Sequence, residues 1–114
     1  LVRSRGLGDV YKRQVRERVA MRSDLSPDLY QLLSKDAVNH VRRNVAANVG
    51  TPPQVLDELC QDVDPSVRFR VALNEVTSNV TFERLEQDAF EPVRLAASSR
   101  PRGKGEGGYG WGGG

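Results

Sequence analysis

Four arginines recur along the chain at a constant spacing of 26 residues, and three aspartates recur at the same spacing. A regular row of guanidinium groups is able to bind phosphates or an acidic partner. Each aspartate also lies six residues before the next arginine, so these side chains are able to pair and tie one repeat to the next. We favour such an inter-repeat ladder because each arginine stem lies beside apolar residues, and partner binding stays open. The residues are Arg16, Arg42, Arg68, Arg94, Asp36, Asp62 and Asp88.

Other residue types that could carry chemistry are scarce. Cys60 is the one cysteine and His40 the one histidine, too few for an internal disulfide or a clustered metal site. Residues 103–108 match G-x-G-x-x-G literally, but the nucleotide-binding motif needs a strand before it and a helix after it, and neither is predicted. Asn79 begins a glycosylation sequon in form, without any sign of secretion. We therefore expect no catalytic residues, no cofactor, no metal and no small-molecule substrate.

The whole segment from residue 15 to residue 100 follows the same 26-residue period. Three units span residues 15–40, 41–66 and 67–92, and a partial fourth unit spans residues 93–100. Aligned without gaps, the units share apolar columns. Three of these columns are Val19, Val45 and Val71; Ala20, Ala46 and Ala72; and Leu33, Leu59 and Leu85. So many coincidences at one period indicate an internal repeat.

Each unit predicts two short helices. Val41 and Val45 lie on one face of the first helix, and Asp64-Pro65 supplies an N-cap followed by a proline that suits the first turn. The second helix begins near a serine or threonine, and Thr51 with Gln54 fits a capping box. No segment alternates strictly between apolar and polar residues, so no strand is predicted. A unit this short cannot bury both helices alone, which favours a stacked all-α solenoid.

Asp64-Pro65-Ser66-Val67-Arg68 and Val71-Ala72-Leu73-Asn74 carry the pattern of a known family, and residues 41–62 repeat most of it. The chain resembles the bacterial leucine-rich repeat variant proteins, relatives of the HEAT and armadillo α-solenoids. The resemblance implies a right-handed superhelix of two-helix repeats, in which the second helix is shorter and partly 3₁₀. A member of that family carries an iron–sulfur cluster on a cysteine-rich segment. With Cys60 alone, this cofactor is not carried over, because such clusters need about four thiolates.

The net charge of +2 over 114 residues hints at an anionic partner, but the surplus is confined to one end. Residues 1–14 carry a net charge of +3, residues 15–102 carry −1, and residues 103–114 are neutral. Residues 9–14 resemble the in-frame translation of a sequencing adapter, so we expect residues 1–14 to be artefactual or disordered. The glycine-rich residues 101–114 are also expected to be disordered.

These features predict a right-handed α-solenoid, armadillo- or HEAT-like, of about three 26-residue two-helix repeats. We interpret it as a non-enzymatic repeat scaffold, a fragment of a longer solenoid, whose partner is another protein. The alternative is a nucleic-acid-binding solenoid that uses the stripe of Arg16, Arg42, Arg68 and Arg94. No apolar run approaches the about 18 residues of a membrane span, and no secretory signal is recognisable. We therefore expect a cytoplasmic protein.

Overall fold

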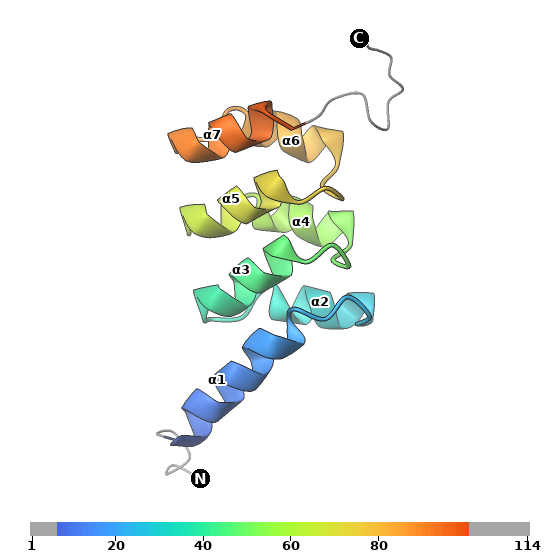
Figure 1. Cartoon of the computed structure of the whole chain (residues 1–114), viewed down its shortest axis with the longest axis vertical. Coiled ribbons are helices and arrows are strands. Elements are labelled where there is room, and N and C mark those ends of the chain that lie inside the picture. Colours follow the sequence, from blue (N-terminus) through green and yellow to red (C-terminus); the bar gives the residue numbers. More distant parts are fainter. Residues whose placement is uncertain (1–6, 101–114) are drawn as a thin grey trace.

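The computed structural model describes residues 7–100, and this part of the chain forms seven α-helices and no strand. The helices are α1 (Leu7–Val19), α2 (Pro27–Leu33), α3 (Asn39–Ala47), α4 (Pro53–Leu59), α5 (Pro65–Leu73), α6 (Asn79–Leu85) and α7 (Glu91–Ser98). From α2 onward, helices two apart in the series begin 26 residues apart. The period of the sequence is therefore also the period of the structure, and successive helix pairs stack along one axis (Figure 1).

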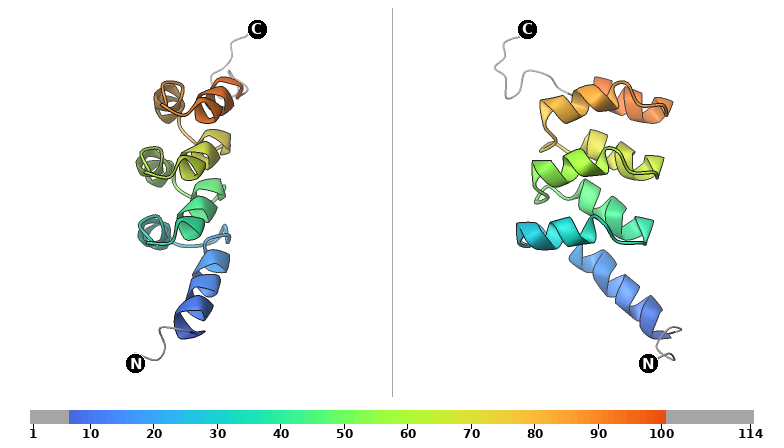
Figure 2. Two further views of the ribbon diagram at one scale, coloured as in Figure 1. Left: turned by 90° about the vertical axis from the view of Figure 1, so that its left-hand side faces the viewer. Right: turned by 180° about the vertical axis from the view of Figure 1, so that it is seen from behind.

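The helices form two layers, which the side view in Figure 2 separates clearly. We call α1, α3, α5 and α7 the long-helix layer, and α2, α4 and α6, each of seven residues, the short-helix layer. Along the long-helix layer α1 contacts α3, α3 contacts α5, and α5 contacts α7. The molecule measures 59 × 30 × 15 Å. This arrangement confirms the predicted fold class, an all-helical repeat solenoid.

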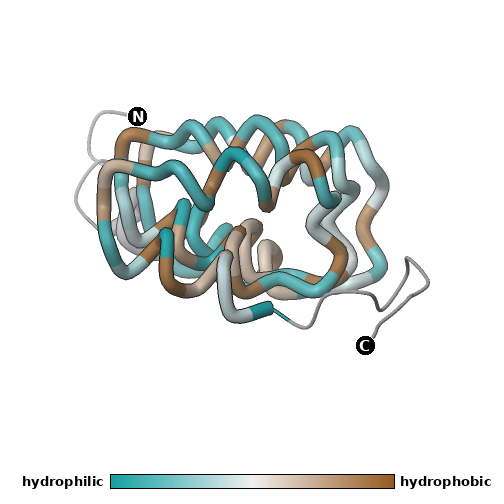
Figure 3. The backbone as a smooth tube through the Cα atoms, turned by 90° about the horizontal axis from the view of Figure 1, so that it is seen from above, coloured by the Kyte–Doolittle hydropathy of each residue, from teal (hydrophilic) through white to brown (hydrophobic). Residues whose placement is uncertain are grey.

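The core lies between the two layers and repeats with the same period. Valines of α3, α5 and α7 and the leucine that ends each short helix are buried in successive units. Figure 3 looks along the stack and shows the two layers facing one another. The fully or almost fully buried members are Val41, Val67 and Val93; Val45 and Val71; and Leu33, Leu59 and Leu85. Burial of each such side chain contributes about 1.5–3 kcal/mol, so every repeat adds a similar share to the stability of the stack.

Side-chain N-caps are present at the starts of α2, α5 and α6 and absent at those of α3, α4 and α7. Asp64 accepts from the backbone N–H of Ser66 at the start of α5, and this confirms the predicted cap. The predicted capping box at Thr51 is wrong. The residue before α4 is Pro52, and the Thr51 hydroxyl donates instead to the carbonyl of Val45, at 2.7 Å. That contact adds a second donor to a carbonyl at the C-terminal end of α3, which also accepts from the N–H of Asn48.

The short helices are α-helical, where the family resemblance implied a partly 3₁₀ conformation. In α4 the N–H of Leu56 donates to Pro52 O, an i→i−4 bond, and the N–H of Cys60 donates to Leu56 O in the same pattern. Bonds of the 3₁₀ type occur at the two ends of α4, from the N–H of Val55 to Pro52 O and from the N–H of Asp62 to Leu59 O.

Gly50 lies where the first two repeats meet, and a side chain there is excluded by close packing. A Cβ atom on Gly50 would lie 2.6 Å from the Tyr30 hydroxyl oxygen and 2.7 Å from the carbonyl oxygen of Ser23. Tyr30 occupies the column of Leu56 and Phe82, and its hydroxyl donates to the carbonyl of Arg22 at 2.7 Å. The tyrosine at position 30 therefore requires a glycine at position 50.

The predicted ends of the array lie partly outside the described residues. The glycine-rich segment 101–114 and residues 1–6 are outside them, and residues 7–14 form the first part of α1. The foreign origin of residues 1–14 stays a prediction, as do the unit boundaries at residues 15, 41, 67 and 93.

Candidate functional site

The recurring arginines and aspartates lie together along one edge of the stack. Arg42, on α3, donates from Nε and Nη2 to the two carboxylate oxygens of Asp62 at 2.7 and 3.1 Å. Arg68 contacts Asp88 in the same way at 2.8 and 3.2 Å, and Arg16 is bound equivalently by Asp36. These are two-pronged, charge-assisted contacts, the strongest geometry open to an arginine and a carboxylate. We call this set the arginine–aspartate ladder.

Arg42 and Arg68 also contact the aspartate that lies six residues earlier, but through Nη1 and its backbone carbonyl. Arg42 Nη1 donates to the carbonyl oxygen of Asp36 at 2.8 Å, and Arg68 Nη1 donates to that of Asp62 at 2.7 Å. The sequence suggested an ion pair at this six-residue separation, and the carboxylate partner is instead 20 residues ahead. The reason is topological, because the loop before α5 returns to pack beside α3 and carries Asp62 to Arg42.

The aspartates also shape the loops that lead into the next helix. Asp36 Oδ1 accepts from the N–H of Val38, and Asp62 Oδ1 accepts from the N–H of Asp64, both at 2.9 Å. A short polar side chain that bonds the backbone two residues ahead is a common turn device. One carboxylate therefore fixes the entry to a long helix and holds the arginine of the preceding long helix.

The environment of the ladder favours its charged forms. The side chains of Arg42 and Asp62 are only 14% and 8% exposed, and the bond to Asp62 raises the pKa of Arg42 against the effect of burial. Partial burial opposes ionisation of Asp36, but hydrogen bonds from Arg16 and from the N–H of Val38 outweigh it. The pKa of Asp36 is therefore lowered.

Arg94 repeats only half of this pattern. Its Nη1 donates to the carbonyl oxygens of Asp88 and Ala89 at 2.8 and 3.2 Å. Among the described residues no acidic side chain forms an ion pair with it, and the residue 20 positions further along is Gly114. Arg94 therefore marks the C-terminal limit of the ladder within residues 7–100.

A second repeating contact, between asparagines and backbone carbonyls, was not singled out from the sequence. The side-chain amide of Asn48 donates to the carbonyls of Ala20 and Arg22 at 2.8 and 2.6 Å. Asn74 makes the equivalent bonds to Ala46 and Asn48, both at 2.9 Å. Both asparagines are buried. The signal was available, because they share one column of the repeat and a buried polar side chain must find partners.

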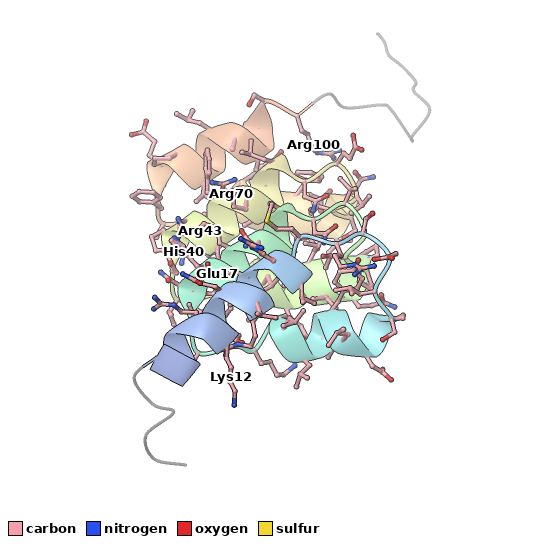
Figure 4. All side chains as sticks on the ribbon, turned by 60° about the horizontal axis from the view of Figure 1, so that its bottom comes forward. Lys12, Glu17, His40, Arg43, Arg70 and Arg100 are labelled. Atoms are coloured by element: carbon pink, nitrogen blue, oxygen red, sulfur yellow. The ribbon has the colours of Figure 1, made fainter. Side chains whose placement is uncertain are left out.

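The outward side of the long-helix layer, whose residues are half-buried or exposed, behaves differently, because its columns do not repeat. One column holds Glu17, Arg43, Phe69 and Leu95; another holds Arg18, Asn44, Arg70 and Ala96; a third holds Met21, Ala47, Leu73 and Ser99. Figure 4 shows Glu17, His40, Arg43 and Arg70 following one another along α1, α3 and α5. The buried columns and the ladder thus build one scaffold, while the exposed columns give each repeat its own chemistry.

The remaining residues that the sequence singled out lie apart from one another. Cys60 is a buried free thiol at the end of α4, where burial raises its pKa, and His40 is exposed near the start of α3. Asn79 is the first residue of α6 and accepts a bond from Arg100 at 2.7 Å. No group of three or more potential metal ligands occurs among the described residues. Residues 103–108 lie outside them, and none of the described helices is long and apolar enough to cross a membrane.

Comparison with known proteins bears on one complete helix pair. Residues 40–64 match the family model described as leucine rich repeat variant. The match runs from the second residue of α3 to the N-cap of α5, and so covers both helices of one repeat. A search of curated proteins and a search of solved structures returned no match. Residues 40–64 are thus similar to a repeat of the leucine rich repeat variant family, a HEAT-like helical repeat, as the sequence predicted.

Proposed function

We propose that this protein is a non-enzymatic scaffold whose exposed helix faces bind another protein. The observation that supports this is the contrast between the two kinds of column. The ladder and the valine and leucine columns of the core keep the same residue in successive repeats, whereas one half-buried to exposed column of the long-helix layer changes from Glu17 to Arg43, Phe69 and Leu95. A surface that is charged in one repeat and apolar in the next suits a partner whose own surface mixes charged and apolar groups without a regular period. Protein surfaces have this mixed character.

The alternative, a solenoid that binds nucleic acid, needs a cation in register with a regular polyanion. The one column with a cation in every repeat is the ladder column. Its guanidinium groups at Arg16, Arg42 and Arg68 are already bound to carboxylates on their Nε and Nη2 edge. Releasing them for phosphate would leave the aspartates half-buried and unpaired, at a cost of several kcal/mol for each ion. This geometry favours a protein partner, with the ladder as the joint between repeats.

The test is a direct comparison of the two classes of ligand on the whole chain. A random-peptide phage library is selected against the immobilised protein, and single- and double-stranded oligonucleotides are titrated into it at several salt concentrations. We expect enrichment of a related set of peptides and no saturable oligonucleotide binding at physiological salt. Tight oligonucleotide binding that falls steeply with salt, together with no enriched peptide, would contradict the proposal. The bacterial source and the cytoplasmic location stay predictions.

A further inference from the structure

We infer that the exposed face of α3, α5 and α7 docks an acidic amphipathic segment of a partner protein, with its apolar side chains on α5 and α7 and its carboxylates toward Arg43 and Arg70. The inference rests on the proposed function, and it adds a surface and a partner chemistry. Two independent properties of this face carry it, an exposed apolar cluster and a local excess of positive charge.

The apolar cluster consists of Phe69, Leu73 and Leu95. Phe69 and Leu73 are four residues apart on α5 and so share one face of the helix. Leu95 occupies the position of Phe69 on α7, the helix that packs beside α5. Leu73 is 58% exposed and Leu95 is 60% exposed, while Phe69 is partly buried against the core. A contiguous exposed apolar surface on a soluble fold marks a site of interaction, whereas single exposed apolar residues do not.

The short-helix layer offers a useful contrast. Leu32 on α2 is 68% exposed, yet the equivalent positions on α4 and α6 are Glu58 and Arg84. An exposed leucine there has charged residues instead of apolar ones in its column, so no apolar surface extends over neighbouring helices. Exposure alone therefore does not distinguish the two layers, and the clustering of apolar residues does.

The charges on α3 and α5, on one side of the cluster, are positive, whereas α7 carries the acidic Glu91 in its first turn. Helices α3 and α5 together carry four arginines and no acidic residue, whereas α2 and α4 together carry three acidic residues and no basic one. Arg42 and Arg68 are paired with the ladder aspartates, so the arginines of these two helices that could meet a partner are Arg43 and Arg70. In the described part of the chain, Arg70 is exposed and forms no ion pair, and it lies three residues from Leu73. Arg43 lies one repeat before Phe69 in the same column.

The occupant follows from this arrangement. Apolar side chains of a partner would bury the Phe69, Leu73 and Leu95 surface, and carboxylates beside them would meet the two arginines on its α3 side. An amphipathic segment that combines leucine- or phenylalanine-type residues with aspartate or glutamate supplies both. A nucleic acid would satisfy the arginines but would leave the apolar cluster exposed. The combination of both features, not the charge alone, selects a protein segment.

The experiment uses peptides selected from a random library against the whole chain and measures their affinity for matched variants. Leu73→Gln combined with Leu95→Gln removes the apolar cluster while keeping good helix formers, and Leu32→Gln is its control on the other layer. Arg70→Gln removes one exposed cation, and Lys35→Gln, another exposed cation, is the control. Thermal unfolding of each variant verifies that it is folded at the temperature of the assay.

We expect the selected peptides to be rich in both acidic and apolar residues. The double leucine variant should weaken their binding by about tenfold or more and Arg70→Gln by about threefold to tenfold, while both controls stay within about twofold. Peptides that bind but are sensitive only to Leu32→Gln or Lys35→Gln would overturn this inference and leave the scaffold function standing. A library that yields no binder would count against both. Oligonucleotide binding that is lost in Arg70→Gln would overturn the inference in favour of a nucleic-acid surface.

Discussion

At the scale of single residues, the ladder aspartates do two things at once. Asp62 holds the guanidinium of Arg42 through both carboxylate oxygens and also fixes the loop into α5 through the N–H of Asp64. Its side chain is largely buried, so an unpaired partner would have little access to water. The contribution of a ladder contact to stability should therefore be intermediate. Exposed ion pairs contribute at most about 1 kcal/mol, and disruption of a fully buried pair costs about 3–5 kcal/mol.

Replacement of Asp62 by alanine should therefore lower the free energy of unfolding by about 2–4 kcal/mol, because it leaves Arg42 half-buried without a carboxylate. Asp24→Ala is the matched control, since Asp24 pairs with Arg22 but both side chains are more than 60% exposed. It should leave the free energy of unfolding nearly unchanged, because exposed ion pairs are screened by solvent. Urea denaturation of the two variants gives both values. Equal costs would show that burial of the ladder does not matter.

Acid should destabilise the array through Asp36 of the ladder and through Asp64, the N-cap of α5. Hydrogen bonds from Ser66 and Asn39 lower the pKa of Asp64, and those from Arg16 and Val38 lower the pKa of Asp36 against the effect of its burial. A pKa that is lower in the folded state than its unfolded value of about 3.9 gives stability that is present above that value and is lost as the pH falls through the folded pKa. The Tm should therefore be level near neutral pH and fall below about pH 4. Asp36→Asn should start from a lower Tm and show a shallower fall. An identical slope for the variant would contradict this assignment.

At the scale of elements, the repeats are joined at their long helices by side chains that bind backbone. Asn74 links the C-terminal end of α5 to the C-terminal end of α3 by donating to the carbonyls of Ala46 and Asn48. Thr77 closes the following loop by donating to the carbonyl of Val71 at 2.8 Å. Carbonyls at a helix end need such partners when they are buried, so these polar residues fix the spacing of the stack.

Asn74→Ala should cost about 2–4 kcal/mol, because it leaves the buried carbonyl of Ala46 without this donor, at about 1–3 kcal/mol, and removes a second bond of about 1 kcal/mol to Asn48 O, which still accepts from the N–H of Thr51. The control is Asn44→Ala, which removes a single bond, from the Asn44 amide to Glu17 O, at a half-buried site. That change should cost about 1 kcal/mol. Chemical denaturation measures both. A loss for Asn74→Ala no larger than that for Asn44→Ala would contradict the role given to the asparagine column.

The comparison between sequence and structure also belongs to this scale. The repeat period, the helix pairs and the Asp64 cap were predictable because apolar spacing and cap chemistry act locally. The role of Thr51 was not predictable from the sequence. Its hydroxyl is able to bond either to the start of α4 or to the carbonyl of Val45, and the conformation of the folded loop determines which bond forms. The partner of Arg42 depends likewise on which loop returns beside α3. The cluster of Phe69, Leu73 and Leu95 appears only after the long helices are stacked.

At the scale of the whole molecule, the stack is nearly one-dimensional, because each helix pair contacts mainly its neighbours. Stability then depends on every interface along the stack, and the middle unit contributes to two of them. Leu59, at the end of α4, is 3% exposed and belongs to the central core. Loss of its packing should therefore affect the repeats on both sides.

Leu59→Ala should lower the free energy of unfolding by about 2–5 kcal/mol, with loss of helicity throughout the array instead of in one repeat. Leu32→Ala, at an exposed position in α2, should leave the melting curve nearly unchanged. Circular dichroism melts of the two variants test this directly. An unaltered cooperative melt for Leu59→Ala would remove that column from the core.

We assign opposite roles to two arginines of α5 that are two residues apart. Arg68 belongs to the joint between repeats, and Arg70 belongs to the surface offered to a partner. The most direct test is the Kd of one library-selected peptide for Arg68→Gln and for Arg70→Gln, at a temperature where both variants are folded. We predict a Kd within about twofold of the wild type for Arg68→Gln and about threefold to tenfold weaker for Arg70→Gln. Equal weakening in both variants, or weakening in Arg68→Gln alone, would contradict the division between scaffold and binding surface.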